Sequence, residues 1–154
     1  MTTPETRWAN CYIKATTLLP NILAKTEAQS RGFDDAVFVT HDNEVRECTA
    51  SNVYLVTEGA VWMPPRNNSV LHGITQHFLL ECADSIGIGV HERLMLLEQV
   101  RTADEVFMSS TAVEVLGITR LDDQTIGNGR VGPITRRLHQ AFVDRIPQKL
   151  TRFE

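Results

Sequence analysis

The strongest constraint on the fold of this chain is the alternation of short apolar segments of strand type with longer segments of helical periodicity. Strand-type segments cover residues 11–15, 35–39, 45–57, 60–63, 90–95, 105–109 and 113–120. Helical periodicity covers residues 18–31, 73–85, 97–103 and 133–146. Because the two types alternate along 154 residues, the sequence predicts one α/β (α+β) domain with a mixed sheet.

Turn-forming residues separate these segments. Glu58 and Gly59 mark a hairpin turn between two strands, and Gly32 ends the first helix. After the last helix, residues 148–154 are expected to form a loose tail. We therefore assign the domain to residues 1–147.

Composition excludes several function classes. The net charge is −4 and the basic residues are scattered, so we expect no nucleic-acid partner. No apolar run is long enough to cross a membrane, and the first residues lack the pattern of a signal peptide. The three cysteines and five histidines show no metal-ligand spacing, so no metal site is expected. A reduced, cytoplasmic protein is the plain interpretation.

Lys14 is the first candidate for chemistry, because it lies among apolar neighbours in the predicted strand at residues 11–15. Burial of an ammonium group is costly, and one outcome is a lowered pKa and a nucleophilic amine. The alternative is an exposed position on an alternating strand, which is the commoner situation for lysine. The local sequence alone favours this exposed alternative.

Three further polar elements have both a functional and an ordinary interpretation. Glu47 is either an exposed strand residue or a buried acceptor for a protonated ring nitrogen. Residues 71–75 place a glycine at a helix start, which suits a phosphate but is also typical of a simple helix cap. Residues 109–112 form a hydroxyl-rich turn that could complete a phosphate cradle or be only a polar turn.

The order of these elements carries more information than any one of them. The segments are residues 11–21 (CYIKATTLLPN), 47–53 (ECTASNV), 71–75 (LHGIT), 104–111 (DEVFMSST) and 129–135 (GRVGPIT). In this order they resemble motifs of the fold-type IV, pyridoxal-phosphate-dependent aminotransferases, which include the D-amino-acid and branched-chain enzymes. The resemblance extends from Arg7 to about Ile146, and the lysine segment is most similar to that of the D-amino-acid members.

The resemblance implies the large cofactor-binding domain of the D-amino-acid aminotransferase-like fold, and it assigns a role to each motif. Lys14 would hold pyridoxal phosphate as a Schiff base and move a proton between the substrate Cα and the cofactor C4′. The other implied contacts are Glu47 with the pyridine nitrogen, Leu71 with a ring face, Ile74 and Thr75 with the phosphate, Thr111 with a further hydroxyl contact, and Ser110 and Ala112 flanking the cofactor and substrate.

The implied activity is amino-group transfer between an amino acid, of the D-alanine type, and a 2-oxo acid, by a homodimer. The alternatives are a branched-chain aminotransferase, an aminodeoxychorismate lyase-like enzyme, or an inactive fragment that binds the cofactor or only dimerises. Two residues depart from the family motifs: Cys48 replaces a glycine and Gln76 replaces an arginine. Only 13 residues precede Lys14, so the small N-terminal domain of the family is expected to be absent.

Overall fold

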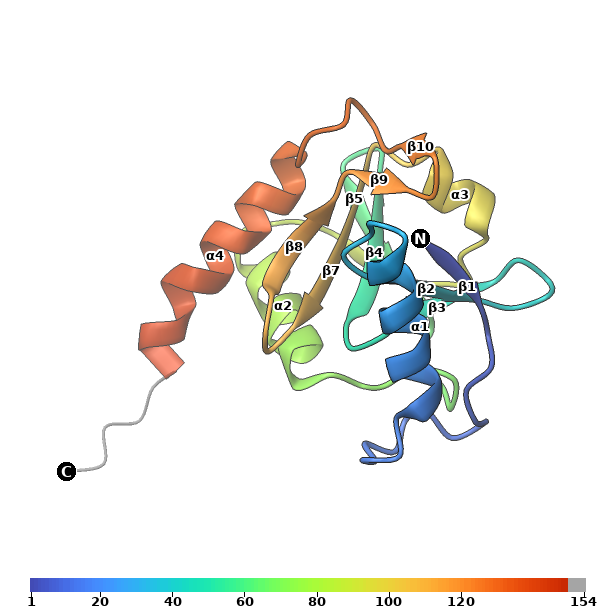
Figure 1. Cartoon of the computed structure of the whole chain (residues 1–154). Coiled ribbons are helices and arrows are strands. Elements are labelled where there is room, and N and C mark those ends of the chain that lie inside the picture. The colour runs from blue at the N-terminus through green and yellow to red at the C-terminus, as the bar shows by residue number, and fades with distance from the viewer. Residues whose placement is uncertain (150–154) are drawn as a thin grey trace.

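A computed structural model describes residues 1–149 of the chain, with side-chain surroundings up to residue 146, and it has the predicted alternation of strands and helices (Figure 1). The helices are α1 (Leu19–Ser30), α2 (Ile74–Ser85), α3 (Leu97–Arg101) and α4 (Pro133–Lys149). The strands are β1 (Thr2–Pro4), β2 (Val37–Val39), β3 (Val45–Cys48), β4 (Asn52–Thr57), β5 (Ala60–Met63), β6 (Val90–Glu92), β7 (Glu105–Ser110), β8 (Glu114–Ile118), β9 (Arg120–Leu121) and β10 (Gln124–Thr125). Among the described residues, no helix has the length and apolar character needed to cross a membrane.

A five-stranded sheet in the order β6-β5-β4-β7-β8 forms the centre of the molecule. It is mixed, because β5 pairs with β6 in parallel while the other pairs are antiparallel. Side chains alternate between its faces along each strand. Tyr54 and Val56 pack with α2 and α4, whereas Val53 and Leu55 pack with β2, β3 and α3. The sheet is therefore covered on both faces, and its mixed pairing confirms the predicted mixed sheet.

A smaller sheet in the order β1-β2-β3 carries the N-terminal part of the chain. Its buried side chain Phe38 packs with Ala24 and Ala28 of α1. The outward face of α1 carries large apolar side chains, since Leu19, Ile22 and Leu23 are 64%, 58% and 60% exposed. The helix thus has a narrow alanine contact with the domain and a broad apolar face toward solvent.

The prediction of a strand at residues 11–15 is wrong. This stretch consists of turns and bends, because Ile13 N bonds Asn10 O at 3.1 Å and Tyr12 N bonds Asn68 O at 3.3 Å. The first is a contact within a turn and the second is a single contact with a loop, and neither begins the hydrogen-bond ladder of a β-sheet. Conversely, β1 was not predicted and exists because it pairs in parallel with β2.

The C-terminal boundary also differs from the prediction. Helix α4 continues to Lys149, so residues 148–149 are helical and are not part of a loose tail. The rest of the predicted tail, residues 150–154, lies outside the described residues. The predicted strand at 113–120 is interrupted after Ile118, and the chain resumes pairing in the short hairpin of β9 and β10.

The start of α4 is held by a buried carboxylate on β7. Glu105 accepts hydrogen bonds from the backbone N–H of Ile134 (2.9 Å) and of Thr135 (2.8 Å), and from the Thr135 hydroxyl (2.6 Å). A Cβ atom at Gly132 would lie 1.9 Å from the Glu105 Cδ atom, so glycine is required for this approach. The carboxylate satisfies N–H groups that a helix N-terminus otherwise leaves without partners.

We predict that Glu105→Gln destabilises the domain by about 2–3 kcal/mol, because an amide presents a donor to groups that are all donors. The measurement is the free energy of unfolding from urea denaturation. Glu98→Gln, at an exposed position on α3, is the control and should change it by less than about 0.5 kcal/mol. Equal stability of the Glu105 variant and the control would contradict the prediction.

Candidate functional site

Most of the predicted site residues come together at one end of the inner strands β4 and β7 of the five-stranded sheet, a place that we call the sheet edge. Strand β4 begins there at Asn52, and the antiparallel β7 ends there at Ser110, with Asn52 opposite Ser109. The Asn52 side chain also donates to Leu71 O at 2.8 Å, which attaches the loop before α2 to the same edge. Segments distant in sequence therefore converge where the family motifs lie.

Glu47, on β3, is buried and surrounded by hydrogen-bond donors. Its Oε2 accepts from Leu71 N (3.0 Å) and from Asn52 Nδ2 (3.2 Å), and its Oε1 accepts from Leu71 N (3.2 Å) and from the Arg7 guanidinium. Burial raises the pKa of Glu47 above its usual value, and the Arg7 charge is the strongest opposing influence. Glu47 is only 6% exposed, so it is not an exposed strand residue, and its role toward a ring nitrogen stays a prediction.

The N-terminus of α2 is an uncapped helix end beside two hydroxyl groups. Gly73 is the N-cap residue and no side chain caps the helix, so the first N–H groups lack intrahelical partners. The hydroxyl oxygens of Thr75 and Thr111 lie 3.4 Å apart. Together these groups form a site that suits an anion.

Gly73 also explains how the helix start reaches this edge. A Cβ atom at this position would come within 2.5 Å of the Asn52 Oδ1 atom. Glycine therefore allows the backbone before α2 to lie against Asn52, which itself bonds Glu47. The buried carboxylate and the helix N-terminus are thus joined through one amide side chain.

Lys14 is exposed, in the irregular segment that replaces the predicted strand. The segment is attached through Tyr12 to Asn68, in the loop that leads to Leu71 and α2. In the described part of the chain, Lys14 makes no hydrogen bond or ion pair with Glu47 or Thr75. Lys14 is therefore exposed, as one alternative from the sequence expected, but it lies in an irregular segment and not on a strand, and its chemical role stays a prediction.

The side chains present fit pyridoxal phosphate in their chemistry. The cofactor has a ring nitrogen that can carry a proton, a phosphate, and an aldehyde that reacts with amines. The edge offers a buried carboxylate (Glu47), an uncapped helix N-terminus with two hydroxyls (Thr75 and Thr111), and an accessible amine on the segment joined to the same loop (Lys14). Each group has the charge or reactivity that the matching part of the cofactor requires.

Sequence analysis missed two charged residues that contact this site. Arg7 bonds Glu47 from forty positions away, and Glu5 bonds Arg7 in turn. Nothing in the local sequence marks either residue as part of the site, because Arg7 lies in the irregular segment after β1 and Glu47 lies on β3. Asn52 lay within a recognised motif, but its contacts with Glu47 and Leu71 were not foreseen.

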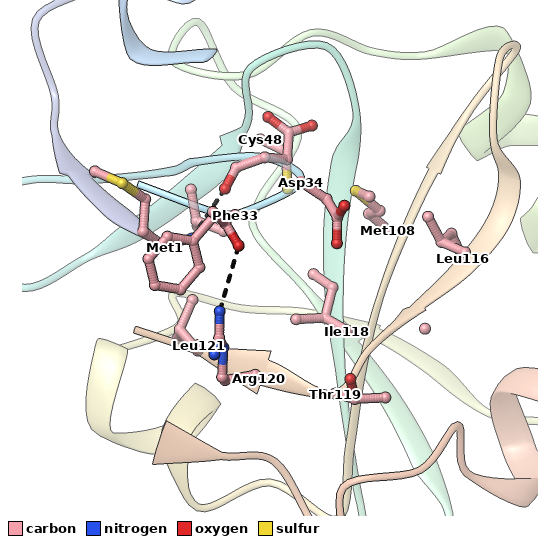
Figure 2. A pocket seen from close by; sticks show the side chains of 14 residues that line it. Met1, Phe33, Asp34, Cys48, Met108, Leu116, Ile118, Thr119, Arg120 and Leu121 are labelled. Atoms are coloured by element: carbon pink, nitrogen blue, oxygen red, sulfur yellow. Dashed lines mark hydrogen bonds between the residues drawn. The ribbon is translucent and has the colours of Figure 1, made fainter. Parts of the chain in front are cut away.

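A cavity of about 360 Å³ lies apart from these residues. Figure 2 shows the side chains that line it. Met1, Phe33, Met108, Ile118 and Arg120 are among its lining residues, and none of the predicted cofactor residues is. Cys48, which stands where the family usually has glycine, lines this cavity, and it follows Glu47 directly on β3. The side chains of successive strand residues point to opposite faces of the sheet, so Cys48 faces the cavity and Glu47 faces Asn52 and Leu71.

Comparison with known proteins gives consistent results. A family model described as "Amino-transferase class IV" matches residues 2–121. The chain is 40% identical over 146 residues to a D-alanine aminotransferase of Listeria monocytogenes (strain 10403S), covering 95% of this chain and 50% of the relative. It is 34% identical to the D-alanine aminotransferase of Bacillus licheniformis, covering 95% of this chain and 51% of the relative. The chain spans about half the length of these relatives.

Solved structures agree with this result. A branched-chain amino acid aminotransferase of Escherichia coli superposes with a TM-score of 0.83 at 30% identity, covering 93% of this chain and 47% of that one. A branched-chain amino acid aminotransferase of Thermobaculum terrenum in its PLP form superposes with a TM-score of 0.82 at 31% identity, covering 88% of this chain and 45% of that one.

The uncapped helix end predicts the effect of removing one hydroxyl. Thr75→Val should weaken binding of pyridoxal phosphate to the chain by about tenfold to a hundredfold, the usual range for a lost hydrogen bond to a charged group. Binding of pyridoxal, which lacks the phosphate, should not change. Fluorescence titration with both compounds measures this. Thr102→Val, which removes a hydroxyl that donates to Glu98 O at the end of α3, is the matched control. Equal weakening for both compounds would contradict a phosphate contact.

Proposed function

Because this chain belongs to the class IV aminotransferase family, we propose that it is the cofactor-binding part of an enzyme that transfers an amino group between an amino acid and a 2-oxo acid with pyridoxal phosphate. The observation that carries the proposal is the convergence of a buried carboxylate and an uncapped helix N-terminus at the sheet edge. The chain spans half the length of its relatives, so the activity of the whole protein is part of the proposal.

The proposal assigns a role to each of the site residues. When bound, pyridoxal phosphate supplies an aldehyde for covalent attachment and a protonated ring that withdraws electrons. Lys14 attaches the cofactor and later moves a proton between the substrate Cα and the cofactor C4′. Glu47 keeps the proton on the ring nitrogen, since a nearby negative charge favours the protonated form.

The remaining residues bind and orient the cofactor. Leu71 packs against a face of the ring. The backbone N–H groups of Ile74 and Thr75, with the hydroxyls of Thr75 and Thr111, hold the phosphate. Ser110 borders the cofactor on the substrate side. The uncapped start of α2 and the neighbouring hydroxyls support this assignment.

We propose a D-amino acid such as D-alanine as the amino donor. Support comes from the lysine segment at residues 11–21 and from relatives named D-alanine aminotransferases at 40% and 34% identity. A branched-chain donor is the second candidate, because the matching solved structures carry that name. Product analysis with a 2-oxo acid as acceptor separates transfer from the elimination that a lyase-like enzyme would catalyse.

We further propose that the chain forms a homodimer in the cytoplasm. The exposed apolar side chains of α1 and the segment before it support self-association, since a patch of this kind is typical of an interface. These side chains are Trp8, Tyr12, Ile13, Leu18, Leu19, Ile22 and Leu23. The three free cysteines, two of them buried, support a reducing environment.

The first prediction from this proposal concerns the attachment site. Borohydride reduction of the chain with bound pyridoxal phosphate, followed by peptide mass mapping, should place the added mass on Lys14. The partly exposed Lys25, which pairs with Asp35 at 3.3 Å, provides an internal comparison. An even distribution of the added mass over Lys14 and Lys25 would contradict the role of Lys14.

The second prediction concerns activity. The 154-residue chain should bind the cofactor but show little transamination of D-alanine with 2-oxoglutarate. Fusion to the remaining half of the Listeria monocytogenes relative should raise the rate by at least about a hundredfold, because substrate positioning and water exclusion then become possible. Lys14→Ala in the fusion is the inactive control. Full activity of the chain alone would show that this requirement is wrong.

The third prediction concerns self-association. Sedimentation velocity should show a dimer, and the double variant Leu19→Glu with Ile22→Glu should be monomeric, because both side chains lie on the exposed face of α1. Val143→Glu, at an exposed apolar position on α4, is the control and should remain dimeric. A parent chain that is monomeric at all concentrations would contradict the proposal.

A further inference from the structure

A buried guanidinium lies behind Glu47 that none of the roles described above uses. The Arg7 side chain is 4% exposed, and it lies between two carboxylates, whose side chains are 8% exposed for Glu47 and 20% exposed for Glu5. Arg7 donates to Glu47 through Nη1, and to Glu5 through Nε (3.0 Å) and Nη2 (2.6 Å). Arg7 also donates through Nη2 to Ser69 O (3.2 Å) and lies over the ring of Phe38 (4.4 Å to the centroid). The guanidinium therefore has a fixed position.

The two carboxylates together give the group of three side chains a net negative charge, which Arg7 with a single carboxylate would not have. A pair of Arg7 and Glu47 alone would be neutral, and the guanidinium would cancel much of the field of Glu47. Glu5 binds the other edge of Arg7 in a forked contact, which brings the group of three to one net negative charge when both acids are ionised. A protonated ring nitrogen then has a negative charge to balance it.

We propose that Arg7 and Glu5 are positioning residues for the cofactor: Arg7 fixes the Glu47 carboxylate, and Glu5 balances the Arg7 charge, so that Glu47 presents net negative charge to the protonated ring nitrogen. This inference rests on the proposed function, because it requires pyridoxal phosphate at Glu47. Neither residue contacts the reacting atoms in this assignment, and both act through Glu47.

The surroundings of Glu47 shift its pKa in opposite directions. Burial raises the pKa of Glu47, Arg7 opposes this, and Glu5 adds to it. The other titratable groups nearby are Cys11 and Cys48, and burial raises the pKa of both thiols, so they stay neutral at physiological pH. Arg46, which precedes Glu47 on β3, forms an ion pair with Glu44, with 2.5 Å between Nη2 of Arg46 and Oε2 of Glu44. After burial itself, Arg7 has the largest influence on the pKa of Glu47, and Glu5 is the other charged side chain that shifts it.

These directions have a consequence for stability. The pKa of Glu47 is higher in the folded chain than in the unfolded chain, so the folded state holds more protons between the two values. Stability of the cofactor-free chain therefore falls as pH rises through this window. Arg7→Met should move the upper end of the window to higher pH, because it removes the opposing charge. Glu5→Gln should move it to lower pH.

The test uses the 154-residue chain in two states. In the cofactor-free chain, the Glu47 carboxyl is titrated by carbon-13 NMR, with Glu47→Gln to assign the signal. With bound pyridoxal phosphate labelled at the ring nitrogen, nitrogen-15 NMR reports protonation of that atom. Glu5→Gln should lower the pKa of Glu47, reduce ring protonation at a given pH, and weaken cofactor binding roughly tenfold. Circular dichroism confirms that each variant is folded.

Glu44→Gln is the matched control, because Glu44 and Arg46 form the same type of ion pair, two residues apart, without bonding Glu47. The double variant Glu5→Gln with Arg7→Met is the sharpest comparison, since it restores one net negative charge at Glu47. Ring protonation in the double variant should exceed that in Glu5→Gln alone, which a merely structural role of both residues would not produce.

The outcomes separate the two proposals. If the parent chain binds no pyridoxal phosphate, the proposed function is contradicted, and the role toward the ring nitrogen is contradicted with it. If the cofactor binds but Glu5→Gln leaves ring protonation and the pKa of Glu47 at the control values, the inference alone is overturned. A double variant with less ring protonation than Glu5→Gln would also overturn it.

Discussion

The hydrogen bonds of the Glu47 carboxylate are the interaction on which the candidate site depends. They connect the N-terminal segment through Arg7, strand β4 through Asn52, and the loop before α2 through Leu71. A buried carboxylate must be surrounded by donors, since an unpaired charge in a protein interior is very costly. The need to satisfy one side chain therefore makes three distant segments meet, and the uncapped start of α2 is brought to the sheet edge as a result.

A second buried carboxylate, Glu105, fixes α4 by the same physical means, but all the donors around it belong to the start of that helix. The loop between Glu47 and Asn52 has a different support. Asn21 of α1 donates to Thr49 O at 2.7 Å, and the Thr49 hydroxyl bonds Asp35 at 2.5 Å. Helix α1 thus positions the loop of the candidate site on one face while its other face is apolar and exposed.

Local sequence predicted the elements that depend on local apolar patterns. The segment at 60–63 matches β5 to the residue, and the helix ending at Ser85 matches the end of α2. Both have a clear period and turn or stop signals at their ends. The strand expected at 11–15 failed because Tyr12 and Ile13 have the apolar character of a strand but no neighbouring strand to pair with. A strand needs a partner, and periodicity alone does not supply one.

The sequence by itself determined the α/β class with a mixed sheet and the family motifs, because residue type and spacing encode these directly. Only the tertiary structure decided that Glu47 is buried, that Asn52 links it to Leu71, and that Arg7 and Glu5 lie behind it. The environment of a carboxylate depends on which donors the fold brings near. For Glu47 the charged donor lies forty residues away on another segment. No local pattern specifies such a partner, since its selection depends on the packing of the entire domain.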